Sequence, residues 1–192
     1  MKRSYFSEIA PIQFEGPQSQ NPLAYRYYDK NRLVAGKTME QHLRMAVCYW
    51  HSFNWEGSDV FGAGTFNRPW HGGPLNQAAA DHKLDEAFEF FTRLGLPYFC
   101  FHDVDVMAQA HTIREHVDNL LHIVEKIQAK MSATGVKLLW GTANLFSHPR
   151  YMAGGATNPD PEVFRFAATQ VDRKSTRLNS SHTVLSRMPS SA

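Results

Sequence analysis

His102 and Asp105 stand three residues apart at the point where an apolar run of the chain ends. A short apolar run such as 98–101, bounded by turn signals, is typical of a strand buried on both faces of a parallel sheet. Ligands in such folds bind beyond the carboxyl ends of the strands. A histidine titrates near neutral pH, and a nearby carboxylate can orient it or raise its basicity. The pair therefore predicts acid–base chemistry, and the alternative is a capped strand end whose aspartates begin a turn.

Two further apolar runs, 45–53 and 136–141, also end in polar and aromatic residues. Several aromatic rings around a His–Asp pair suit a substrate with a polar edge and C–H faces, such as a sugar. Packing at the mouth of a barrel would explain the rings equally well. The polar and aromatic residues at the end of the first run are Trp50, His51, Phe53, Asn54 and Trp55, followed by Asp59, Phe61 and Gly62; those at the end of the other run are Thr142, Asn144, Phe146 and His148.

A helical pattern follows each of the three runs. Apolar residues recur at helical spacing over 84–94, 113–131 and 164–171, and Gly95 and Gly135 end the first two helices. The alternation of strands and helices predicts an α/β fold with a parallel sheet and right-handed crossovers. Three strands cannot close a barrel, so the predicted domain is incomplete.

The remaining segments are predicted to be less regular. Residues 1–35 have the turn signals of an extended arm, and a short helix is expected over 37–46. Residues 56–76 are rich in Gly, Pro, Asn and aromatic residues, which is typical of a long loop after a strand. Long loops inside compact domains are usually functional.

Composition points to an ordinary soluble domain in a reducing compartment. Cys48 and Cys100 both lie inside apolar runs, which favours core positions over a disulfide or a metal site. The sequence shows no signal-peptide pattern and no window near the ~18 apolar residues of a membrane span. We therefore expect a cytoplasmic protein without a membrane partner. The net charge is +2, but residues 172–192 carry +3 and residues 1–171 carry −1, which gives no support for a nucleic-acid partner.

Four motifs in register closely resemble xylose isomerase, in its longer bacterial type with an N-terminal extension. Shorter matches at 150–151 and 156–164 continue the family's order, and the resemblance covers residues 1 to about 171. The four motifs are Cys48-Tyr49-Trp50-His51-Ser52-Phe53, Phe66-Asn67-Arg68-Pro69-Trp70, Phe101-His102-Asp103-Val104-Asp105 and Leu138-Leu139-Trp140-Gly141-Thr142-Ala143-Asn144.

The resemblance implies the N-terminal part of a (β/α)₈ TIM barrel. Residues 1–44 would form the extended N-terminal arm, and residues 45–171 would form about three βα units. Members of the family are homotetramers that interconvert D-xylose and D-xylulose, and often D-glucose and D-fructose, by a hydride shift. They use two divalent cations (Mg²⁺, Mn²⁺ or Co²⁺), which polarise the substrate oxygens.

The same resemblance implies roles for individual residues. His102 would bind the sugar ring oxygen and assist ring opening, and Asp105 would hold the tautomer and orientation of that histidine. Trp50 and Phe146 would line the sugar pocket, and Thr142 would lie on its rim.

Another aromatic residue, Phe61, would reach into the site of a neighbouring subunit of the tetramer. No metal ligand is expected in this chain, because the family's ligands come from later strands. Asp103 beside His102 does not make a divalent-cation site without a third group.

The resemblance stops near residue 171, within the last predicted helix. Residues 172–192 lack an apolar stripe, and they back-translate in frame into a sequencing-library adapter, beginning gat cgg aag agc for Asp172 to Ser175. We interpret this tail as artefactual and disordered. The alternative is a genuine basic tail.

Three interpretations of function stay open. The first is a fragment of xylose isomerase, which we expect to be inactive without the remaining βα units. The second is another metal-dependent TIM-barrel enzyme acting on sugars or phosphates. The third is a non-catalytic binding protein whose basic tail contacts nucleic acid.

Overall fold

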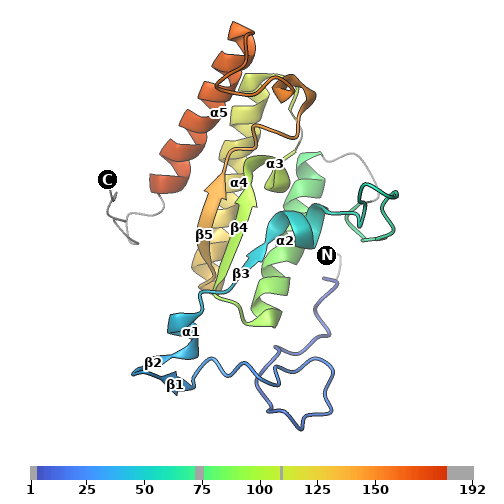
Figure 1. Ribbon diagram of the computed structural model, residues 1–192, viewed down its shortest axis with the longest axis vertical. Coiled ribbons are helices and arrows are strands. Elements are labelled where there is room, and N and C mark those ends of the chain that lie inside the picture. The colour runs from blue at the N-terminus through green and yellow to red at the C-terminus, as the bar shows by residue number, and fades with distance from the viewer. Residues whose placement is uncertain (1–3, 72–75, 109, 181–192) are drawn as a thin grey trace.

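The chain forms a mixed α/β structure built around a three-stranded parallel sheet. A computed structural model describes residues 4–71, 76–108 and 110–180. The sheet contains β3 (Ala46–Cys48), β4 (Tyr98–His102) and β5 (Lys137–Thr142), in the spatial order β3-β4-β5. Figure 1 shows β4 between its two neighbours. The predicted parallel sheet is therefore confirmed, and the arrangement is compatible with part of a TIM barrel.

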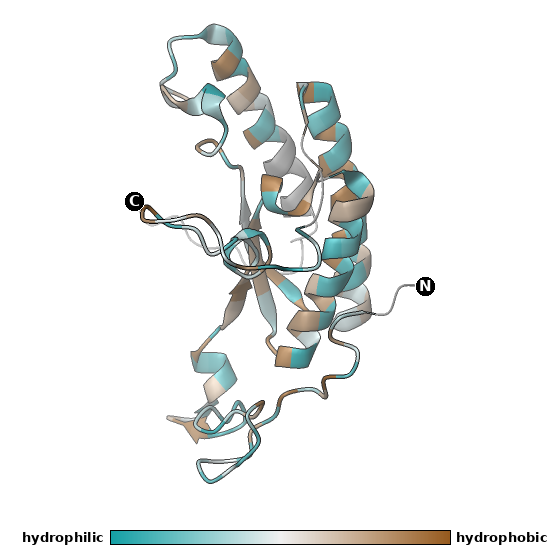
Figure 2. Ribbon diagram, turned by 90° about the vertical axis from the view of Figure 1, so that its right-hand side faces the viewer, coloured by the Kyte–Doolittle hydropathy of each residue, from teal (hydrophilic) through white to brown (hydrophobic). Residues whose placement is uncertain are grey.

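Three long helices pack beside the sheet: α2 (Gln77–Leu94), α4 (Ile113–Thr134) and α5 (Pro161–Ser180). In Figure 1, α4 lies behind β4 and β5. The Phe99 ring of β4 lies 5.2 Å from the Phe88 ring and 5.3 Å from the Phe91 ring, both on α2. These fully buried rings form the centre of the core, so the apolar stripe of α2 covers one face of the sheet. Figure 2 shows brown (hydrophobic) and teal (hydrophilic) residues alternating along the helices, as expected for helices with one apolar face.

The ends of the helices are set by local chemistry. The Asn76 side chain accepts a hydrogen bond from the Ala79 N–H at the start of α2, and Thr112 does the same for α4. Gly95 and Gly135 follow α2 and α4 with φ of 66° and 75°, a left-handed conformation that glycine adopts without steric cost. The predicted helix ends at both glycines are confirmed.

The first predicted strand, 45–53, is wrong beyond Cys48. The strand ends at Cys48, and the chain turns into a π-helical turn, η1 (Trp50–Asn54). An apolar run of this length is ambiguous between a strand and a buried helical turn, since both bury all of its side chains.

The predicted helix over 37–46 is also shorter than expected. A small hairpin of β1 (Leu33–Val34) and β2 (Lys37–Thr38) precedes a single turn of helix, α1 (Met39–His42). The segment before it has little regular structure, and it is held to the end of α2 by two hydrogen bonds, from the Ile12 N–H to the Arg93 carbonyl and from the Tyr25 hydroxyl to the Leu94 carbonyl, both 2.7 Å.

Two short helices lie near the carboxyl ends of the strands: α3 (Asp103–Val106) and η2 (Pro149–Tyr151).

Towards the C-terminus, α5 continues to Ser180, which differs from the disorder predicted from Asp172 onward. Once a helix is nucleated, each further residue adds one backbone hydrogen bond, so α5 extends beyond its apolar stripe. Residues 181–192 of the predicted tail lie outside the described residues. None of the described helices is long and apolar enough to cross a membrane.

Candidate active site

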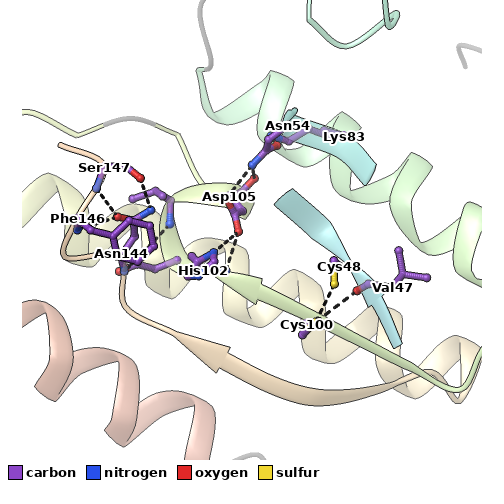
Figure 3. A network of polar contacts seen from close by, with 12 residues as sticks. Val47, Cys48, Asn54, Lys83, Cys100, His102, Asp105, Asn144, Phe146 and Ser147 are labelled. Atoms are coloured by element: carbon purple, nitrogen blue, oxygen red, sulfur yellow. Dashed lines mark hydrogen bonds and ion pairs between the residues drawn. The ribbon is translucent and has the colours of Figure 1, made fainter. Parts of the chain in front are cut away.

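The predicted pair, His102 and Asp105, is brought together where β4 ends and α3 begins. Asp105 Oδ2 accepts a hydrogen bond from the His102 backbone N–H at 2.7 Å and lies 3.0 Å from ring atom Nδ1. The two side chains are only 15% and 8% exposed. One carboxylate oxygen therefore fixes both the backbone and the imidazole of His102, as Figure 3 shows. This geometry is that of a histidine oriented for proton transfer.

Three aromatic rings surround the imidazole of His102. The Trp50 ring lies 4.8 Å from it, the Phe146 ring 5.4 Å and the Trp140 ring 5.9 Å, between ring centroids. Trp50 comes from η1, Trp140 from β5 and Phe146 from the loop after β5. Trp140 lies in one of the four motifs shared with the family, but the sequence analysis gave it no role in the site. Its position one residue before the end of the apolar run 136–141 was the feature that could have identified it.

The other two predicted site residues lie differently. Thr142 pairs with His102 in the register of β4 and β5, so both stand at the same carboxyl edge of the sheet. Phe61 is not brought to this edge: it lies in the loop after η1, and its side chain is 93% exposed. Within this chain the candidate site therefore contains Trp50, His102, Asp105, Thr142 and Phe146, and it does not contain Phe61.

Two polar residues to which the sequence assigned no role stand behind Asp105: Asn54, which was named only among the residues at the end of the first run, and Lys83. Asn54 Nδ2 donates to Asp105 Oδ1 at 2.9 Å, and Lys83 Nζ donates to Asn54 Oδ1 at 2.7 Å. Burial lowers the pKa of Lys83 to about 8, and the charge of Asp105 partly opposes this shift. A lysine inside the apolar stripe of α2 was the only sequence signal for this contact.

The neighbouring carboxylate, Asp103, is fully buried and has a different set of partners. Its Oδ1 accepts hydrogen bonds from the backbone N–H groups of Val104 and Asn144, both at 2.9 Å, and its Oδ2 accepts from Gln170 Nε2 at 2.7 Å. His116 Nε2 lies 3.5 Å from the same Oδ2. Asp103 therefore ties α4, α5 and the loop after β5 to the end of β4. A cavity of about 340 Å³ lies beside this network, on the side of η2.

A divalent-cation site needs several hard ligands, which for Mg²⁺ and Ca²⁺ are mostly oxygens. In residues 4–71, 76–108 and 110–180, no group of three or more His, Cys, Asp or Glu side chains is arranged to hold a metal ion. Asp103 is occupied by protein donors, and Asp105 faces His102 and Asn54. The described residues therefore do not make up a metal centre by themselves.

The two cysteines lie side by side on adjacent strands. Cys48 and Cys100 are paired in the register of β3 and β4, and their sulfur atoms are 3.9 Å apart, so both thiols are free. The pKa of the Cys100 thiol is raised to about 12, mainly because the thiol is buried and to a smaller extent because Cys48 lies beside it. Cys100 is buried in the core, as predicted, whereas Cys48 is only partly buried.

No family model matches the chain. Over 171 residues the chain is 78% identical to a xylose isomerase from Solibacter usitatus (strain Ellin6076). The aligned region covers 89% of this chain and 39% of that protein. Xylose isomerases from Paraburkholderia phytofirmans and Haemophilus influenzae (strain 86-028NP) are 60% and 55% identical over 168 residues, or 88% of this chain and 38% of each relative. The chain spans about two fifths of the length of these relatives. It is therefore a homologue of the xylose isomerases over most of its length, and it corresponds to an N-terminal fragment of such a protein.

Proposed function

We propose that this chain is the N-terminal part of an aldose–ketose isomerase that converts D-xylose to D-xylulose. The identity to xylose isomerases supports the substrate class. The observation that carries the proposal is the imidazole of His102, oriented by Asp105 and surrounded by Trp50, Trp140 and Phe146 at the carboxyl edge of the sheet. Such an edge combines a proton donor with apolar walls that fit the C–H faces of a sugar.

In this proposal His102 opens the sugar ring. The Asp105 carboxylate accepts a hydrogen bond from Nδ1–H and stabilises the imidazolium form, whose Nε2–H can donate its proton to the ring oxygen. As the bond between the anomeric carbon and the ring oxygen breaks, the ring oxygen takes that proton and the anomeric hydroxyl releases its own proton to water. Trp50 and Phe146 would hold the apolar faces of the sugar, and Thr142 would contact a hydroxyl group at the rim.

The complete protein would be a (β/α)₈ barrel in the cytoplasm, of which this chain supplies about three βα units. It would assemble as a homotetramer, in which the exposed Phe61 reaches a neighbouring subunit's site. Two divalent cations would polarise the substrate oxygens in the complete protein. Because the described residues do not make up a metal centre by themselves, the ligands would come from the rest of the protein, and this chain alone would lack activity.

A chimera tests this proposal. Residues 1–171 are joined to the part of the Solibacter usitatus xylose isomerase that the alignment leaves uncovered, and conversion of D-xylose is measured with Mg²⁺ present. We expect the chimera to be active and the 192-residue chain to be inactive. His102→Asn in the chimera should lower kcat by about 10²-fold or more, as for loss of a general acid.

The matched control is His122→Asn, because His122 lies on the exposed face of α4. A folded chimera with no activity on D-xylose, or with equal activity after His102→Asn, would contradict the proposal. Activity on another aldose but not on D-xylose would favour a different sugar-processing enzyme.

A further inference from the structure

We propose that Lys83 and Asn54 are positioning residues, which hold the Asp105 carboxylate in the orientation that His102 needs. This inference rests on the ring-opening role of His102 proposed above. It assigns a function to a buried lysine on α2 and an amide on η1, neither of which lies at the sugar-facing edge of the site.

The contacts form one continuous chain of hydrogen bonds, drawn in Figure 3. Lys83 Nζ donates to Asn54 Oδ1 at 2.7 Å, Asn54 Nδ2 donates to Asp105 Oδ1 at 2.9 Å, and Asp105 Oδ2 lies 3.0 Å from His102 Nδ1. Asn54 Nδ2 also lies 3.3 Å from the Asp105 carbonyl oxygen. Four elements, α2, η1, α3 and β4, meet at this chain of contacts.

The burial of Lys83 needs an explanation beyond packing. Lys83 is only 4% exposed, and lysine is almost never fully buried unless it is paired. In the part of the chain that the structure describes, the ammonium group has the Asn54 amide oxygen at 2.7 Å and the face of the Tyr49 ring at 5.6 Å, with no direct carboxylate partner within 4.0 Å. An apolar side chain would fill this position on α2 at a lower desolvation cost.

The ammonium group determines which way the Asn54 amide points. An ammonium group only donates hydrogen bonds, so the amide must turn its oxygen towards Lys83 and its NH₂ group towards Asp105. The NH₂ group then occupies Asp105 Oδ1, which leaves Oδ2 for the backbone and the ring of His102. Without Lys83 the amide oxygen would lose its donor, and only the contact with Asp105 Oδ1 would hold the Asn54 side chain in place.

The chimera also tests this inference, by a double-mutant cycle. We expect Lys83→Met to lower kcat on D-xylose about tenfold, and to lower it by less than twofold when Asp105 is already Asn. A role in packing alone would lower activity equally in both backgrounds, because it does not depend on the Asp105 charge. The matched control is Lys130→Met, which removes a lysine from a solvent-exposed ion pair with Asp85 and should leave kcat unchanged.

A second variant, Asn54→Ala, keeps Lys83 in place and covers the case in which Lys83→Met fails to fold. It should show the same tenfold loss and the same dependence on Asp105. Unchanged kcat in either folded variant, or equal losses with and without the Asp105 carboxylate, would overturn the inference.

A readout that does not depend on activity separates this inference from the proposed function. The ¹⁵N chemical shifts of the His102 ring in the folded chimera report which nitrogen carries the proton, whether or not the chimera is active. We expect Nδ1 to carry the proton in the dominant neutral tautomer, because it faces Asp105 Oδ2, and we expect the fraction of that tautomer to fall at least twofold after Lys83→Met. An inactive chimera together with this change would refute the isomerase proposal and keep the positioning role, whereas unchanged shifts would refute the positioning role.

Discussion

Asp103 and Asp105 show how neighbouring residues of one type take different roles. Both lie on the single turn of α3, but Asp103 is fully buried and accepts three hydrogen bonds from protein groups. Asp105 instead shares its oxygens between His102 and Asn54. A carboxylate saturated by protein donors is structural, whereas one that faces a titratable ring can tune its chemistry. The buried Lys83 contributes to this second role, because it holds the Asn54 amide that contacts Asp105.

Lys83 should make stability depend on pH. Burial lowers its pKa to about 8 from the ordinary value of 10.5. Between these values the unfolded chain holds the proton that the folded chain has released, so the free energy of unfolding rises with pH, by at most about 1.4 kcal/mol per pH unit. The thermal midpoint of the chimera should therefore rise relative to that of its Lys83→Met variant between pH 8 and 10.

The comparison with Lys83→Met is needed because two other buried groups act in the opposite direction. Burial raises the pKa of Tyr49 and Cys100, so each of them destabilises the folded state as their unfolded forms ionise. Tyr49 and Cys100 are present both in the chimera and in its Lys83→Met variant, so their effects cancel in the difference between the two thermal midpoints. A difference that stays constant from pH 8 to 10 would show that Lys83 keeps its ordinary pKa.

At the scale of elements, one side chain links α5 to the sheet. Gln170 is 2% exposed, donates to Asp103 Oδ2 at 2.7 Å and to the Asn144 carbonyl at 3.1 Å, and accepts from the Tyr151 hydroxyl at 2.7 Å. These partners come from α3, the loop after β5, and η2. The orientation of α5 at the edge of the sheet is therefore set by a polar network as well as by the apolar contact of Ala167.

Gln170→Leu should destabilise the chimera by about 3 kcal/mol, because it leaves a buried carboxylate oxygen, a carbonyl and a hydroxyl without their partners. The fall in the midpoint of thermal unfolding measures this cost. Gln128→Leu is the matched control, since Gln128 lies on the exposed face of α4 and should shift the midpoint only slightly. Equal shifts for the two variants would mean that water replaces the lost hydrogen bonds.

At the scale of the whole molecule, the sheet is open on both sides. In the described residues β3 and β5 each pair only with β4, so each has one unpaired edge. Large apolar side chains are also exposed, among them Val60, Phe61 and Met152, each more than 90% accessible. Unpaired strand edges and exposed apolar groups favour association between chains.

We therefore expect the isolated 192-residue chain to self-associate at micromolar concentration and to lack a single cooperative unfolding transition. Sedimentation velocity and urea denaturation measure the two properties. The chimera, in which the remaining βα units cover these surfaces, is the control and should give one defined assembly. A monomeric 192-residue chain with one sharp transition would contradict this expectation.

Local sequence patterns were sufficient to predict the existence of the three long helices, the parallel sheet and the resemblance to the family, but not η1, the length of α1 or the end of α5. Glycines at helix ends and apolar periodicity report interactions between residues close in the chain, and for this reason Gly95 and Gly135 were placed correctly. The strand predicted over 45–53 was wrong beyond Cys48, because an apolar run can be buried either as a strand or as a helical turn. The His102–Asp105 pair was visible because its members lie within one turn.

The support behind that pair depends on packing between distant segments. Asn54 and Asp105 are 51 residues apart, and Lys83 and Asn54 are 29 residues apart. No spacing rule brings such residues together, since their contact requires α2, η1 and α3 to meet at the end of β4. The chemistry at the strand end was thus readable from neighbouring residues, whereas the groups that orient it became apparent only from the three-dimensional arrangement.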